Sequence, residues 1–90
     1  MNTSSKDNVL SRKERDKLRN KEAILKAAVH LFAKKGFAET KLEDVAIRAE
    51  FGKGTLYNYF ENKDDLLLSA FDFAVRNMLE FLYDQLSSVT

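Results

Sequence analysis

The sequence predicts an all-α protein, in which a three-helix bundle of helix-turn-helix type is followed by a long fourth helix. Hydrophobic residues make up 44% of the 90 residues and proline is absent, which favours a compact helical chain over a disordered one. Apolar residues recur at helical spacing in four segments, and helix start and stop signals separate them. A chain of this length buries only roughly 60% of its unfolded surface, so a thin core is expected.

The first helix is expected over residues 18–35. Residues 1–17 begin with small polar residues and lack an apolar stripe, which predicts a basic, largely disordered tail. Lys34 and Lys35 place positive charge in the last turn, and Gly36 is the kind of residue that commonly follows a helix end. The apolar positions of this helix are Leu18, Ile24, Leu25, Ala28, Leu31 and Phe32.

A capping-box pattern predicts where the second helix begins. In Thr40-Lys41-Leu42-Glu43 the threonine would cap the helix and the glutamate would reach back to it. Apolar residues then follow at i, i+3, i+4 and i+7, and the helix is expected to end near Glu50. These residues are Leu42, Val45, Ala46 and Ala49.

Two further helices are expected in the remainder of the chain. The third spans about residues 53–60, with Leu56 and Phe60 as its apolar positions. The fourth opens at Asn62 in an Asn-x-x-Asp pattern, with acids favouring its N-terminal dipole, and continues to about Leu86. Two short helices joined by a tight turn form the helix-turn-helix unit, which places its second helix in the DNA major groove. Residues 40–60 have this layout, although the same spacing also occurs in helical bundles that never touch DNA.

Charge is distributed unevenly along the chain. Residues 1–63 hold fourteen Lys or Arg against nine Asp or Glu, whereas residues 64–90 hold only Arg76 against five acids. The front part could therefore meet a polyanion, and solvated helix faces are the alternative. The basic residues between positions 12 and 21 could likewise follow a DNA backbone or enter a minor groove, or could form a solvated extension of the first helix.

The outward face of the third helix carries side chains suited to reading DNA. At about 100° per residue, Leu56 and Phe60 point inward, which leaves Gly54, Thr55 and Asn58 outward. Gly54 lets the backbone approach a large ligand closely. Thr55 can contact a thymine methyl group, and Asn58 matches the donor and acceptor edge of adenine. The flanking residues Tyr57 and Tyr59 carry hydroxyl groups that can reach phosphates.

Two stretches resemble a known family. "TKLEDVAIRAEFGKGTLYNYFENKDDLL" (residues 40–67) and "ILKAAVHLFAKKGFAETKLEDVA" (residues 24–46) are similar to the DNA-binding segment of the TetR family of bacterial transcriptional regulators. The family commonly reads Ala-Gly-Val-Ser-Lys-Gly-Thr-(Leu/Ile)-Tyr-x-(Tyr/His)-Phe in this region. The resemblance covers about residues 22–68, implies a homeodomain-like bundle, and gives a DNA-binding domain over residues 18–67.

The resemblance also implies individual roles. Thr40 and Lys41 correspond to phosphate-contacting positions at the start of the second helix, where Lys41 could also reach a base. Lys53, like Thr55 and Asn58, corresponds to a groove-facing position, and Lys63 to a phosphate-contacting lysine. Structural alternatives exist for several residues, since Thr40 could act only as a cap, Tyr59 could pack in the core, and Lys63 could be solvated. The expected DNA-binding set is Thr40, Lys41, Lys53, Gly54, Thr55, Tyr57, Asn58, Tyr59 and Lys63.

Two departures from the family pattern affect the turn between the second and third helices. Glu50 stands where the family usually has glycine. If this position is left-handed, the substitution costs roughly 1–2 kcal/mol. Gly52 replaces the usual capping serine and is an acceptable cap.

The fourth helix, residues 63–90, is apolar around nearly its whole circumference, which is typical of a helix buried on several sides. Family members typically add a C-terminal domain that binds a small effector and forms a homodimer. We therefore expect either a fragment of a longer regulator or a short protein that associates through this helix. The expected function is a DNA-binding transcriptional regulator, a repressor reading a palindromic operator. The alternative is an interaction module that pairs with a full-length regulator.

Other functional classes find little support. Cysteine is absent, and the lone His30 has no base beside it in the sequence, so neither a thiolate metal site nor a multi-histidine site is expected. No Gly-rich phosphate loop is present. We expect no enzyme activity, no cofactor and no metal. The longest apolar runs are too short to cross a bilayer, and a cytoplasmic location without a membrane partner is expected.

Overall fold

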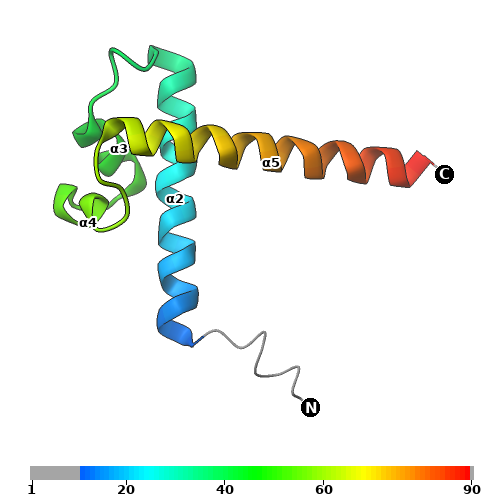
Figure 1. Cartoon of the computed structure of the whole chain (residues 1–90), viewed down its shortest axis with the longest axis horizontal. Helices are drawn as coiled ribbons and strands as arrows, with labels where there is room; N and C mark the ends of the chain where they lie inside the picture. Colours follow the sequence, from blue (N-terminus) through cyan, green and yellow to red (C-terminus); the bar gives the residue numbers. More distant parts are fainter. Residues whose placement is uncertain (1–10, 90) are drawn as a thin grey trace.

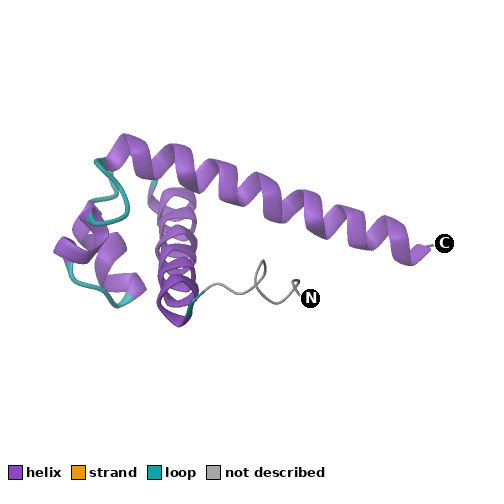
Figure 2. Ribbon diagram, turned by 60° about the horizontal axis from the view of Figure 1, so that its bottom comes forward, coloured by secondary structure: helices purple, strands orange, loops and turns teal. Residues whose placement is uncertain are grey.

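The computed structural model describes residues 11–89 and shows four α-helices in this range. They are α2 (Arg12–Lys35), α3 (Leu42–Ala49), α4 (Lys53–Tyr57) and α5 (Lys63–Val89). α3 and α4 lie together on one side of α2, and α5 crosses α2 and extends away on the other side (Figures 1 and 2). The all-α class and the order of four helices are confirmed.

α2 begins earlier than the sequence analysis placed it. Ser11 Oγ accepts a hydrogen bond from the Glu14 backbone N–H at 3.1 Å, and Glu14 Oε1 accepts one from the Ser11 N–H at 3.0 Å. This reciprocal capping box starts the helix at Arg12. The boundary near residue 18 was therefore wrong, because residues 12–17 are helical. The disorder expected for residues 1–10 lies outside the described residues.

At its other end, α2 stops at the predicted glycine. Gly36 has φ +89°, a conformation that glycine adopts without a Cβ clash. Its N–H donates to the Phe32 carbonyl at 2.9 Å, which satisfies one of the acceptors left open at the helix end. The chain then turns toward α3.

The core lies where the four helices meet. Thr40 is the one buried polar residue of the described chain. The buried apolar residues come from α2, α3, α4, the loop that follows α4, and the first turns of α5. They are Ile24, Leu25, Ala27, Ala28, Val45, Ala46, Leu56, Phe60, Leu66 and Ala70. Leu18, expected on the apolar stripe, is 51% exposed, because it precedes the part of α2 that the other helices cover.

α5 starts as predicted and runs slightly further. Asn62 Oδ1 accepts the Asp65 N–H at 2.8 Å, and Asp65 Oδ2 accepts the Glu61 N–H at 2.9 Å, so both members of the Asn-x-x-Asp pattern bond to the helix start. The helix continues to Val89 instead of Leu86. Its outer half carries large exposed apolar side chains, as the all-round pattern predicted; these include Met78, Leu79, Phe81, Leu82, Tyr83 and Leu86.

Candidate nucleic-acid interface

The turn between α3 and α4 is closed by backbone hydrogen bonds around a left-handed residue. Glu50 has φ 67° and ψ 38°. Its N–H donates to the Ile47 carbonyl at 3.0 Å, and the next N–H, that of Phe51, donates to the Ala46 carbonyl at 2.8 Å. This is the Schellman arrangement, in which a residue after the helix end turns left-handed and closes the orphan carbonyls. The left-handed conformation considered for Glu50 is thus present.

α4 is a single short helix with one open face. Leu56 is 1% exposed and anchors the helix in the core, whereas Tyr57 is 47% exposed. Lys53 and Gly54 are exposed and Thr55 is half-buried. A Cβ placed on Gly54 would meet no atom within 4 Å, so the backbone at this position is open to an approaching surface.

Asn58 and Tyr59 follow the end of α4. The helix was expected to reach residue 60 but ends at Tyr57, because the Asn58 and Tyr59 N–H groups bond to carbonyls three residues back instead of four. Asn58 nevertheless keeps right-handed helical angles, φ −72° and ψ −20°, and its side chain is exposed as its helical position predicted. Tyr59 is half-buried and packs against the core, which agrees with the alternative that this residue packs in the core.

Thr40 does not cap α3. Its side chain is buried, and its hydroxyl donates to the Gly36 carbonyl at 2.8 Å and lies 3.3 Å from that of Leu31. The capping prediction was wrong by one position, because the carbonyls at the end of α2 bind this hydroxyl. Lys41 is the N-cap residue, and its N–H donates to Asp44 Oδ2 at 3.3 Å. In this conformation the Thr40 hydroxyl is turned away from solvent.

Three lysines around this surface have partners within the chain. Lys53 Nζ lies 3.6 Å from Glu43 Oε2, and both side chains are about half exposed. Lys63 is half-buried, and its Nζ lies 4.3 Å from the centre of the Phe37 ring, a cation–π distance. Lys35 Nζ lies 3.0 Å from Asp44 Oδ2. That hydrogen bond, followed by the bond from the Lys41 N–H, lowers the pKa of the Asp44 carboxyl.

Eight of the nine predicted DNA-binding residues lie at the start of α3, in or directly after α4, or at the start of α5, and the ninth, Thr40, is buried. Lys41 lies at the start of α3, Lys53 to Tyr59 form α4 and the turn after it, and Lys63 opens α5. Sequence reasoning missed the partners Glu43 and Phe37, since no spacing rule links them to Lys53 and Lys63. It also missed the hollows that Asn58 and Tyr59 share with lysines of α2.

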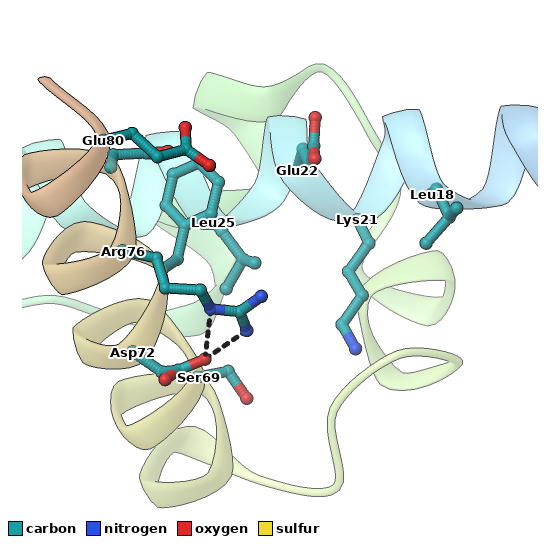
Figure 3. A pocket seen from close by; sticks show the side chains of 10 residues that line it. Leu18, Lys21, Glu22, Leu25, Ser69, Asp72, Arg76 and Glu80 are labelled. Carbon is teal, nitrogen blue, oxygen red and sulfur yellow. Dashed lines mark hydrogen bonds and ion pairs between the residues drawn. The ribbon is translucent and has the colours of Figure 1, made fainter. Parts of the chain in front are cut away.

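A separate hollow of about 360 Å³ lies between α2 and α5 (Figure 3). Leu18, Lys21 and Leu25 line it from α2, and Asp72 and Arg76 from α5. The Arg76 guanidinium is hydrogen-bonded to the Asp72 carboxylate, which raises the pKa of Arg76. Both side chains are more than half exposed, so this pair is a surface contact that belongs to neither α3 nor α4.

Within residues 11–89 no three His, Cys, Asp or Glu side chains are grouped so as to hold a metal ion. None of the helices in this range combines the length and apolar character needed to span a membrane.

Comparison with known proteins identifies the family. The model of the bacterial regulatory proteins of the tetR family matches residues 24–70, which is more than half of the chain and includes α3, α4 and the start of α5. The chain belongs to the tetR family.

The names of individual relatives agree with this family. The chain is 44% identical over 55 residues to the HTH-type transcriptional regulator YerO of Bacillus subtilis, a match that covers 61% of this chain and 19% of that protein. It is 37% identical over 73 residues to YuxN of the same organism, covering 81% and 21%. The HTH-type transcriptional repressor Rv3405c of Mycobacterium tuberculosis is 33% identical over 63 residues, covering 70% and 34%. The chain thus spans a fifth to a third of the length of these relatives.

Proposed function

We propose that this chain binds double-stranded DNA with sequence preference and serves as the DNA-binding part of a transcriptional repressor. The observation that carries the proposal is the open face of α4. Asn58 is exposed there, and Gly54 has no neighbouring atom within 4 Å of its Cβ position. A short helix presented in this way by a helix-turn-helix unit enters the major groove. Thr55 and Asn58 would then meet base edges.

The other members of the set are proposed to hold the chain on the phosphates. Lys41, Lys53 and Lys63 supply positive charge around α4, and Tyr57 and Tyr59 supply hydroxyl groups. Contacts of this kind fix register and orientation without reading sequence. Thr40 enters the proposal indirectly, because its inward hydrogen bonds fix the start of α3 and thereby place Lys41.

Repression and a two-fold operator are the finer parts of the proposal. One relative, Rv3405c, is titled a repressor, and a DNA-bound regulator can repress by occupying a promoter. A single α4 reads only a few base pairs, so useful affinity calls for two copies on half-sites about one helical turn apart. The corresponding operator is palindromic, with the chain acting as a homodimer in its full-length form. A small-molecule effector would bind outside the surface described above.

The test is selection of a preferred duplex from a random pool, followed by binding measurements on Asn58→Ala. This variant should lose on the order of 1–3 kcal/mol on the preferred duplex and little on a random one, with relaxed preference at one position of each half-site. Asn77→Ala is the matched control, since Asn77 is an exposed asparagine on α5, away from α4. Equal losses on both duplexes would show that Asn58 reads no base.

A second function is favoured by one observation, the exposed apolar surface of α5. Phe71 is 68% exposed, Phe81 60% and Leu86 69%, and large exposed apolar surfaces on a protein mark interaction sites. In this reading the chain is a module that pairs through α5 with a full-length regulator. Gel-shift experiments separate the two functions, because a module of this kind associates with protein and does not retard DNA by itself.

A further inference from the structure

Three lysines of α2 lie on the helix face that continues the core-facing stripe. Lys13, Lys17 and Lys21 are spaced at i, i+4 and i+8, so they project from one face of the helix. Further along the same face lie Ile24 and Ala28, both 0% exposed. The face that packs against the bundle in the second half of α2 is therefore occupied by ammonium groups in the first half.

These lysines adjoin the end of α4. One hollow is lined by Lys17 and Lys21 together with Asn58 and Tyr59. A neighbouring hollow is lined by Lys13 and Lys17 with the same two residues. Lys21 also lies with its Nζ 5.8 Å from the centre of the Phe60 ring, so it reaches from α2 toward the segment that follows α4.

Two carboxylates share these hollows, and both are bonded within α2. Glu14 lines the first hollow and accepts the Ser11 N–H through Oε1 at 3.0 Å. Asp16 lines the second and pairs with Arg19 at 3.1 Å. Their charges are thus partly offset by a helix N-terminus and by an arginine.

We infer that Lys13, Lys17 and Lys21 form a phosphate-binding surface beside the base pairs read by α4, an inference that rests on the proposed function. The ligand is the DNA backbone next to the point where Asn58 enters the groove. Because the capping box starts α2 at Arg12, this surface belongs to a helix and not to an extended arm. At about 1.5 Å per residue, the three lysines span about 12 Å along α2, with about 6 Å between neighbouring lysines.

The opposite face of α2 provides a matched comparison. Arg12 and Arg15 lie roughly on the other side of the helix from Lys13 and Lys17 at about 100° per residue, and all four side chains are exposed. The double variant Lys13→Gln/Lys17→Gln and the control Arg12→Gln/Arg15→Gln remove the same charge, and both keep the pair of Asp16 with Arg19. Glutamine keeps helix propensity close to that of lysine and arginine, so both variants should fold, which far-UV circular dichroism checks.

The measurement is the salt dependence of binding to the preferred duplex and to a random one. Loss of two phosphate contacts should make the slope of log K against log salt shallower by about 2 in the lysine variant. Both proteins should lose affinity between about 50 and 200 mM salt. The fold-loss of the wild type should be about ten times larger than the fold-loss of the lysine variant. At the low-salt end it should bind both duplexes more weakly, and the arginine variant should keep the wild-type slope.

Three outcomes would overturn the inference. An unchanged slope in the lysine variant would place these lysines outside the interface. Equal changes in both variants would show that net charge acts without regard to helix face. In either of these two cases, the proposed function is retained if Asn58→Ala still loses affinity for the preferred duplex and little for the random one. Absence of DNA binding by the wild type would overturn the inference together with the proposed function.

Discussion

Replacing Glu50 with glycine should stabilise the protein. Glu50 is the single non-glycine residue with positive φ in the described chain, at φ 67°. This conformation is destabilising for an L-residue because its Cβ lies too close to the following carbonyl oxygen. Glycine has no Cβ, and the turn keeps its two closing hydrogen bonds because both are donated by backbone N–H groups, those of Glu50 and Phe51.

The expected size follows from two opposing terms. Removing the left-handed strain is worth roughly 1–2 kcal/mol. Against this, glycine in place of a residue with a side chain increases the entropy of the unfolded chain, a cost of roughly 0.5–1 kcal/mol. The net gain for Glu50→Gly is then about 0–1.5 kcal/mol, with a midpoint of about 0.75 kcal/mol. For a domain of this size, 1 kcal/mol corresponds to about 4–8 °C in Tm, so the midpoint corresponds to a rise of about 3–6 °C.

Thermal and urea unfolding of three variants test this reasoning. Glu50→Gly should raise both Tm and the urea midpoint. Glu50→Ala removes the same charge but keeps a Cβ, so it should give little gain, and Glu50→Asn should fall between them because asparagine tolerates the left-handed region. A gain in Glu50→Ala equal to that in Glu50→Gly would refute the backbone explanation and assign the effect to the carboxylate.

Three further perturbations have defined outcomes. Gly54→Ala should add up to about 1 kcal/mol of helix propensity and raise Tm, while weakening DNA binding because the added methyl group occupies the open face of α4; unchanged affinity would mean that this backbone does not approach DNA. Asp44→Asn should make the free energy of unfolding depend less on pH in the acid range. The pKa of Asp44 is lowered in the folded protein by Lys35 and then by the Lys41 N–H, so its contribution is complete above the unfolded value of about 3.9 and is lost as pH falls through the folded value; equal urea midpoint changes between about pH 5 and pH 3 in wild type and variant would contradict this. Phe81→Ser combined with Leu86→Ser should abolish self-association in sedimentation experiments without altering Tm of the monomer, since both side chains are well exposed, and a wild type that is monomeric at all concentrations would contradict association through α5.

Local signals predicted most of the fold. Gly36 and Asn62 end and begin helices as expected, because their roles depend on backbone conformation and on bonds within one turn. The start of α2 was misplaced even though Ser11 and Glu14 form a capping-box pair in the sequence, since the charged residues after them carry no apolar stripe. Thr40 was misassigned because its hydroxyl bonds to carbonyls near the end of α2, a choice that depends on tertiary structure.

The exposed face of α4 was predictable for a different reason. Leu56 and Phe60 are buried, and helical geometry then places Asn58 outward whether or not the last turn keeps its hydrogen bonds. The contacts of Lys63 with Phe37 and of Lys53 with Glu43 could not be predicted, because they join side chains from different elements. The DNA contacts themselves stay predictions.

The manner in which α5 is held has a consequence for its dynamics. Leu66 and Ala70 are buried, whereas the side chains of residues 76–88 are exposed. A helical segment of about that length without tertiary support is marginal in water. Amide hydrogens in the outer half should therefore exchange through local fraying, while those near Leu66 should exchange only with global opening. Slow amide hydrogen exchange in the outer half of α5 would then show that another surface covers it.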